Sequence, residues 1–193
     1  MMMFYQEITI LPSNEVSEAF LLSKTYQQLH ISFADKKNND NCNIYGVSFP
    51  EYSIKNNYTS VGNKIRVFAN DEASMNSLNL SKWLYRLNDY IHITKVRKIP
   101  DRIKGYAVYK RFREKNSISK IRRYADYRNI SYKEAQNKLA IKEQECNLPY
   151  IQMKSCTNNN KFSLFVQRIK TDAVINWKFN FYGLSNSSAV PEF

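Results

Sequence analysis

The feature that most constrains the fold is the order in which two hydrophobic periods alternate along residues 1–98. Alternating or short apolar runs predict strands, at residues 4–11, 44–50, 64–69 and 92–98. Apolar residues spaced by three and four positions predict helices, at residues 13–30 and 71–91. The Asn-rich segment 35–43 is expected to form a loop. The predicted order is therefore β-α-β-β-α-β.

This order is the split unit of the ferredoxin-like fold, which many RNA-binding domains share. The usual RNA-binding strand of those domains follows a KGFGFVxF-type pattern, and KIRVFA at residues 64–69 does not match it. Any RNA-binding surface is therefore expected outside this predicted sheet.

The second half of the chain predicts further strands and two helices. A basic helix is expected to begin at Ser117 or Ser119 and to end near Arg128. A second helix begins at Ser131, where Glu134 can complete a capping box. Strands are expected at residues 106–112, 148–155, 162–170 and 177–184.

Together these patterns predict an α+β protein of two domains. Residues 1–98 would form the ferredoxin-like domain. Residues 99–193 would contain the basic helix, the second helix and a small antiparallel sheet.

The formal net charge of +12 is concentrated in the second half. Residues 1–94 hold 8 Lys and Arg against 9 Asp and Glu, whereas residues 95–193 hold 21 against 8. Aromatic residues are interleaved with the densest run of positive charge, namely Tyr106, Tyr109, Phe112, Tyr124 and Tyr127. Clustered cations attract a polyanion, and aromatic rings stack on unpaired bases, so a nucleic acid is the expected partner. A solvated basic face and an anionic membrane surface are less favoured alternatives.

The cysteines and histidines do not form a recognisable metal motif. Cys42, Cys146 and Cys156 are far apart, no CxxC pair occurs, and only His30 and His92 could join them. We therefore expect no metal and no cofactor. No run of about 18 apolar residues predicts a membrane span, and a cytoplasmic location is expected.

Metal-independent RNA cleavage requires a group that exchanges protons, and histidine suits this because its pKa is about 6.5. His30 is expected at the end of the first helix, where the residues alone favour a cap of the last carbonyl groups. His92 falls within a predicted strand and is interpreted as structural. The residues alone therefore do not assign a catalytic role to either histidine.

Several motifs together resemble the crRNA-processing endoribonucleases of the type I-F CRISPR systems. QLHISF around His30 is followed by YGVSFPEY (45–52), and KIRRY (120–124) is followed by LPYIQMKS (148–155). The C-terminal FYGLSNSS motif completes the similarity, which extends over nearly the whole chain. The resemblance implies a metal-independent endoribonuclease that cuts the CRISPR repeat at the 3′ base of its stem-loop and leaves a 2′,3′-cyclic phosphate.

The resemblance also implies roles for individual residues. His30 corresponds to the catalytic histidine, as general base or electrostatic stabiliser, Ser155 to the serine that positions the attacking ribose, and Tyr182 to the tyrosine that orients the histidine. The implied RNA-binding residues are Arg111, Arg113, Lys120, Arg122, Arg123, Arg128 and Phe162.

Among these, Arg111 and Arg113 correspond to a pair that reads bases at the foot of the stem, and Phe162 to an aromatic that stacks on the terminal base pair. This chain departs from a well-known member by having Arg113 in place of glutamine, and Tyr124 and Tyr127 in place of helix arginines. The implied partners are the repeat stem-loop and the other subunits of a type I-F surveillance complex. A non-catalytic RNA-binding subunit of the same complex is the alternative.

Overall fold

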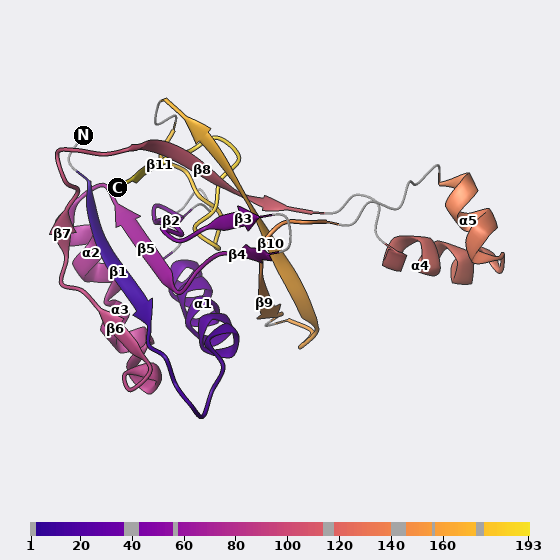
Figure 1. Ribbon diagram of the computed structural model, residues 1–193, viewed down its shortest axis with the longest axis horizontal. Coiled ribbons are helices and arrows are strands. Elements are labelled where there is room, and N and C mark those ends of the chain that lie inside the picture. Colours follow the sequence, from indigo (N-terminus) through magenta and orange to yellow (C-terminus); the bar gives the residue numbers. More distant parts are fainter. Residues whose placement is uncertain are drawn as a thin grey trace. The chain divides into compact units, whose positions relative to one another are not determined.

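The computed structural model describes residues 3–36, 43–55, 58–113, 118–139, 146–155, 157–172 and 176–193. It consists of two compact units (Figure 1). Unit 1 comprises Met1–Arg111 and Leu148–Phe193, and unit 2 comprises Phe112–Asn147. This division differs from the predicted boundary between residues 98 and 99, because the C-terminal strands share one hydrophobic core with the N-terminal sheet.

The N-terminal sheet of unit 1 is antiparallel throughout. Its order is β2 (Gly46–Ser48), β5 (Lys64–Ala69), β1 (Phe4–Ile10) and β6 (Ile91–Ile93), with β7 (Arg97–Lys98) also paired to β1. Ile8 of β1 lies opposite Ile65 of β5, and both side chains are fully buried. Side chains alternate between the two faces of a strand, so Lys64 and Arg66 remain partly exposed while Ile65 and Val67 enter the core.

Helix α1 (Glu18–Asp35) packs Tyr26, Leu29 and Phe33 into this core at helical spacing. Its N-cap is Ser17, whose hydroxyl accepts a hydrogen bond from the backbone of Phe20. The predicted start at Ser13 or Asn14 and the predicted end at His30 were both wrong. The helix continues past His30 because Ser32 and Phe33 extend its buried stripe, and Lys36 is the C-cap.

The helix expected at residues 71–91 is interrupted. It consists of α2 (Glu72–Leu78), α3 (Leu80–Trp83) and the 3₁₀ turn η1 (Tyr85–Leu87). Asn79 has a φ of 48° and breaks the helix, and its side chain then caps α3. The connection that precedes β5 also carries a hairpin that the sequence did not indicate, formed by β3 (Ser53–Lys55) and β4 (Tyr58–Ser60).

A second antiparallel sheet completes unit 1. Its order is β11 (Val190–Glu192), β8 (Gly105–Phe112), β10 (Lys161–Thr171) and β9 (Tyr150–Lys154). The strand predicted at residues 177–184 was wrong, because Gly183 adopts a φ of 71° within a turn. A Cβ atom at this glycine would collide with Val47, so the turn packs directly on β2. The short strand β11 was not predicted.

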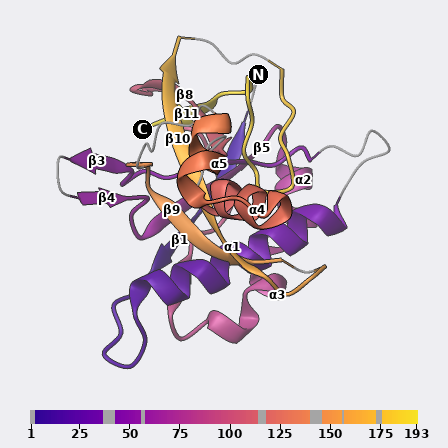
Figure 2. The same ribbon diagram turned by 90° about the vertical axis from the view of Figure 1, so that its right-hand side faces the viewer.

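Unit 2 is a helix pair, α4 (Ile118–Arg128) and α5 (Tyr132–Lys138) (Figure 2). The predicted capping box of Ser131 and Glu134 is confirmed. Ile121, Ala125 and Ala135 form a small core between the helices. The described residues therefore form a mixed α and β structure with antiparallel sheets, and none of its described helices has the length and apolar character needed to cross a membrane.

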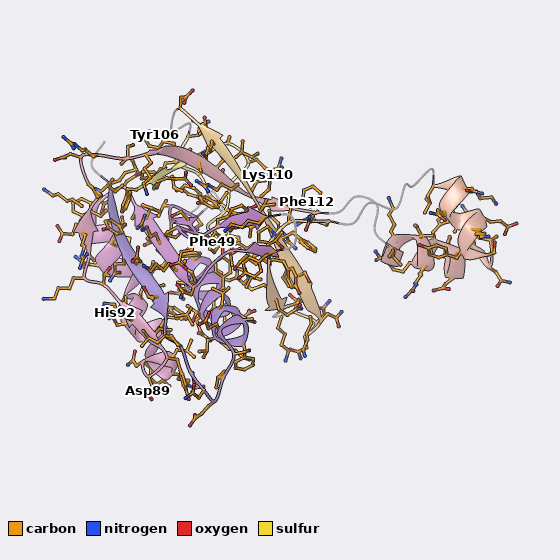
Figure 3. The ribbon with its side chains drawn as sticks, in the orientation of Figure 1. Phe49, Asp89, His92, Tyr106, Lys110 and Phe112 are labelled. Atoms are coloured by element: carbon orange, nitrogen blue, oxygen red, sulfur yellow. The ribbon has the colours of Figure 1, made fainter. Side chains whose placement is uncertain are left out.

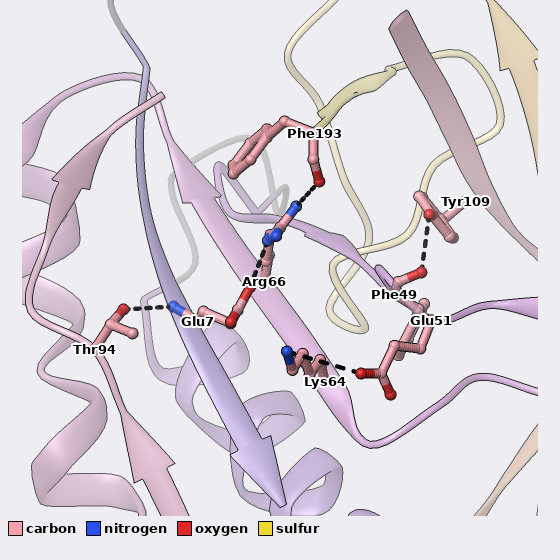
Figure 4. A network of polar contacts seen from close by, with 8 residues as sticks. All are labelled: Glu7, Phe49, Glu51, Lys64, Arg66, Thr94, Tyr109 and Phe193. Atoms are coloured by element: carbon pink, nitrogen blue, oxygen red, sulfur yellow. Dashed lines mark hydrogen bonds and ion pairs between the residues drawn. The ribbon is translucent and has the colours of Figure 1, made fainter. Parts of the chain in front are cut away.

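A polar network joins the two sheets of unit 1 (Figure 4). Arg66 on β5 donates one hydrogen bond of 2.7 Å to the Glu7 carboxylate on β1 and another of 2.7 Å to the carbonyl oxygen of Phe193. Its guanidinium also lies 4.0 Å from the centre of the Phe193 ring. Because Phe193 follows β11, this arginine links the end of one sheet to the centre of the other.

We predict that Arg66→Met will lower the free energy of unfolding by about 2–4 kcal/mol, because it leaves the Glu7 carboxylate and the Phe193 carbonyl without their donor. Lys64→Met is the matched control on the same strand: Lys64 and Glu51 are 3.8 Å apart and their side chains are 37% and 42% exposed. The control should cost less than about 1 kcal/mol. Urea unfolding measures both values, and equal losses would contradict the assigned role of Arg66.

Candidate active site

The turn at residues 180–184 supplies the Tyr182 ring and the Phe181 carbonyl group that contact His30. The Asn180 side-chain oxygen accepts hydrogen bonds from the backbone of Tyr182, at 2.8 Å, and of Leu184, at 3.3 Å. The carbonyl oxygen of Gly183 accepts from the backbone nitrogen of Val47 on β2 at 2.9 Å. The turn is thus shaped by its own asparagine and attached to the N-terminal sheet.

Helix α1 also binds this turn. The hydroxyl of Tyr26 donates to the carbonyl oxygen of Tyr182 at 2.7 Å. Burial raises the pKa of Tyr26, and the neighbouring Tyr182 raises it further, so the hydroxyl keeps its proton and remains a donor. One helical turn later, Nδ1 of His30 lies 2.8 Å from the carbonyl oxygen of Phe181.

The contact between His30 and Phe181 determines the tautomer of the imidazole. A carbonyl oxygen can only accept a hydrogen bond, so Nδ1 must carry the proton. In the neutral ring Nε2 then has a free lone pair, and in the charged ring it is the second donor. The His30 side chain is half-buried rather than enclosed, so Nε2 is the nitrogen available for chemistry.

The rings of His30, Tyr182 and Phe162 form a compact group with Arg111, which we call the His30 cluster. The His30 and Tyr182 rings are stacked, with centroids 4.3 Å apart and planes 7° apart. The Phe162 ring meets Tyr182 edge-on at 6.5 Å. The Arg111 guanidinium lies 5.0 Å from the Tyr182 centroid and 5.3 Å from that of Phe162. Stacking and the hydrogen bond together fix the plane and rotation of the imidazole.

The cluster is suited to proton transfer beside an anion. Arg111 keeps its positive charge at any physiological pH, and it projects from β8 next to the aromatic face that orients His30. Among the described residues, no group of three His, Cys, Asp or Glu side chains could hold a metal ion. The described side chains therefore offer an acid or base and a fixed cation.

Ser155 lies beside α1, in the turn between β9 and β10. Its backbone nitrogen donates to Asn160 at 2.9 Å, and its carbonyl oxygen accepts from Asn159 at 3.0 Å. Ser155 lines a groove with Gln27 and Ile31, which flank His30 on α1. Within the described part of the chain its hydroxyl makes no hydrogen bond to the His30 cluster.

The remaining candidate residues lie in unit 2. Lys120, Arg122, Arg123 and Arg128 are exposed on α4, and Arg113 is exposed in the segment that follows β8. Arg128 lies over the rings of Tyr124 and Tyr127 at 5.8 and 5.5 Å. The structure thus brings His30, Tyr182, Arg111 and Phe162 together in unit 1 and gathers the helix cations in unit 2.

The expectation that His30 caps the end of α1 was wrong, since the helix extends to Asp35 and the imidazole contacts a turn distant in sequence. His92 lies on β6, as predicted, with an exposed side chain (Figure 3). Tyr26 was not identified as a site residue. Its position four residues before His30 was the available signal, because such residues share one helix face.

Comparison with known proteins assigns the chain to a family. The family model described as CRISPR-associated protein (Cas_Csy4) matches residues 5–193. The chain belongs to this family. The resemblance found in the sequence motifs is therefore confirmed over nearly the whole chain.

One curated relative is the CRISPR-associated endonuclease Cas6/Csy4 of Escherichia coli (strain UTI89 / UPEC), which is 28% identical over 194 residues covering 98% of each protein. Two solved structures are similar over most of their length. One, described as "An RAMP protein binding different RNA substrates", aligns with 98% of this chain and 100% of its own chain. The other, described as "CRISPR associated protein Cas6", aligns with 98% of this chain and 98% of its own chain. Their identities are 8% and 11% and their TM-scores 0.33 and 0.30. At this similarity neither structure assigns a residue of this chain.

The tautomer of His30 is directly testable. In ¹⁵N NMR spectra recorded above the imidazole titration, Nδ1 of His30 should show the shift of a protonated nitrogen and Nε2 that of a nitrogen with a free lone pair. The exposed His92 is the internal control. A neutral His30 protonated on Nε2 would show that the Phe181 carbonyl does not hold the ring in solution.

Proposed function

We propose that this protein is a metal-independent endoribonuclease that cuts CRISPR repeat RNA at the 3′ base of its stem-loop. The observation that carries the proposal is the His30 cluster, in which an imidazole of defined tautomer is stacked on Tyr182 beside Arg111. Membership of the Cas_Csy4 family and the name of the E. coli relative, an endonuclease, support the substrate and the reaction class.

In the proposed reaction, the 2′-hydroxyl oxygen next to the cut attacks the adjacent phosphorus while the bond from phosphorus to the 5′-oxygen breaks. The leaving 5′-oxygen takes a proton from water, so the products are a 2′,3′-cyclic phosphate and a 5′-hydroxyl. In this proposal, Nε2 of His30 receives the 2′-hydroxyl proton or, when protonated, stabilises the phosphorane charge. A positioned acid or base contributes on the order of 10²–10⁴ in rate.

The other cluster members have positioning and binding roles in this proposal. Tyr182 holds the imidazole plane, and Ser155 positions the ribose that carries the nucleophile. Phe162 stacks on the last base pair of the stem. Arg111 and Arg113 pair with base edges there, for which the planar guanidinium is suited. The contact of Arg111 with both aromatic rings supports its place at the foot of the stem.

Unit 2 is proposed to hold the stem through its phosphates. One exposed side of α4 carries residues at helical spacing, namely Lys120, Arg123 and Tyr127. Arg128 lies next to this side, because its guanidinium contacts the Tyr124 ring. Arg122 lies on a different side of the helix and would reach a separate phosphate. A-form RNA has a narrow, deep major groove, so phosphate contacts are favoured over base contacts along the stem.

Two further assignments belong to this proposal. The N-terminal sheet is proposed to be ferredoxin-like, and the antiparallel order β2-β5-β1-β6 with intervening helices supports this. The protein is also proposed to retain its hairpin product and to join the other subunits of a type I-F complex at the 3′ end of the crRNA. The alignment covers 98% of the E. coli relative, which supports the proposal that both chains contain the same structural elements.

The chemical proposal predicts that the wild type cuts the repeat hairpin in EDTA. His30→Ala should bind the hairpin with unchanged affinity and cut it about 10²–10⁴-fold more slowly, because only the proton-transfer group is lost. His92→Ala is the matched control and should cut normally. Single-turnover cleavage and filter binding provide the measurements.

Each other outcome of this experiment has a distinct meaning. Cleavage that depends absolutely on a divalent ion would contradict the mechanism. Tight binding without any cleavage by the wild type would favour the non-catalytic RNA-binding subunit. Normal cleavage by His30→Ala would remove the His30 cluster from the reaction.

The binding proposal predicts the salt dependence of affinity. Each phosphate contact contributes about −0.7 to −0.9 to the slope of log affinity against log salt. Arg122→Ala and Arg123→Ala should each weaken hairpin binding and flatten this slope by about one unit. The exposed Arg97 on β7 supplies the control Arg97→Ala. If neither helix variant changes the slope relative to this control, α4 does not contact the phosphates.

A further inference from the structure

Two grooves run along the exposed side of α1. The first lies between α1 and β9, has a volume of about 560 Å³, and contains Ser155 at the β9–β10 turn. The second lies between α1 and the segment formed by α3 and η1, and has a volume of about 620 Å³. Both grooves are lined by Phe20 and Lys24, so they form one continuous track across the helix. We call this the α1 track.

The α1 track combines aromatic rings with positive charge. Phe20 and Tyr85 are 52% and 59% exposed, and the half-buried Trp83 lines the same groove. The cations that line the track are Lys24, Lys82, Arg86, Lys154 and Lys161. The lining of both grooves contains no Asp or Glu.

This composition contrasts with the surrounding sequence. Residues 1–94 have slightly more acidic than basic residues, yet the part of the track they form carries Lys24, Lys82 and Arg86 without a carboxylate. Two of these cations lie over aromatic rings: Lys24 Nζ is 5.1 Å from the Phe20 centroid, and the Arg86 guanidinium is 5.6 Å from that of Tyr85. Exposed rings next to cations are the features that bind unpaired bases and their phosphates.

The position of Ser155 indicates which RNA strand the track would receive. Under the proposed function, Ser155 positions the ribose whose 2′-hydroxyl attacks, so the scissile phosphate lies at this end of the track. The stem is on the other side, at Phe162. The strand that continues past the cut is unpaired, and the α1–β9 groove begins where that strand would leave the serine.

We propose that the α1 track binds the single-stranded RNA immediately 3′ of the cleavage site. This inference rests on the proposed function and extends the RNA that the enzyme recognises. The enzyme would bind the uncut precursor on both sides of the cleavage site. After cleavage the downstream strand is no longer joined to the hairpin, so the track would distinguish precursor from product. The bases would stack on Phe20, Trp83 and Tyr85, and the cations would contact phosphates.

The test compares three uncleavable RNAs that carry a 2′-deoxyribose at the nucleophile position. One ends at the cleavage site, one has about ten unpaired nucleotides added 3′ of that site, and one has the same number added 5′ of the stem. Base stacking predicts that the 3′ extension tightens binding to the wild type by about fivefold to a hundredfold. The 5′ extension should give a smaller gain. Fluorescence anisotropy at fixed salt measures each affinity.

Phe20→Ala and Tyr85→Ala should each remove a large part of the gain from the 3′ extension, with the loss confined to that RNA. Both side chains are more than half exposed, so the variants should fold. Tyr58→Ala is the matched control, because Tyr58 is 63% exposed on β4 and lines neither groove. This control should retain the full gain.

The outcomes separate the two proposals. Equal affinity of the wild type for the bare and 3′-extended hairpins would overturn the track while leaving the hairpin proposal intact. The same holds if the 5′ extension gives the larger gain, or if the variants bind all three RNAs like the wild type. Failure of the wild type to bind the bare hairpin would overturn the proposed function itself.

Discussion

The site depends on two hydrogen bonds that α1 makes to the turn at residues 180–184. Tyr26 holds the carbonyl oxygen of Tyr182 and His30 holds that of Phe181, across separations of 156 and 151 residues. Without these bonds the Tyr182 ring would not be fixed parallel to the imidazole. The stacked geometry of His30 and Tyr182 therefore requires the N-terminal and C-terminal parts of the chain to be in contact. The hydrogen bond from Arg66 to Phe193 stabilises the same contact between these two parts.

Local sequence patterns predicted those helices and strands that are determined by residues close together in the chain. The alternation in residues 4–11 and 64–69 gave strands close to β1 and β5, and the Ser131–Glu134 pair marked the start of α5. The motifs around His30 and Tyr182 selected residues that the structure brings into contact. The family resemblance, rather than residue chemistry, made that selection, because a histidine and a tyrosine 152 positions apart carry no local sign of contact.

Features set by tertiary contacts were missed. The end of α1 was misplaced because Ser32 and Phe33 are held in the helix by burial, which their local pattern did not reveal. Residues 177–184 have the apolar content of a strand, yet the close approach of Gly183 to Val47 requires a turn. The boundary near residue 98 was expected because the predicted β-α-β-β-α-β unit ends there. Strands β8 and β10 nevertheless pack on the N-terminal sheet, because they are apolar on the face that meets it.

The connectivity of the two units has a consequence for how specificity can change. Unit 2 is inserted between the end of β8 and the start of β9, so the chain leaves unit 1 after Arg111 and returns to it at Leu148. Its small core of Ile121, Ala125 and Ala135 shares no residue with the large core that supports His30. Surface substitutions on α4 can therefore accumulate without disturbing the imidazole. Under the proposed function, substitutions on the inserted helices could change which repeat stem is bound while the residues around His30 stay the same.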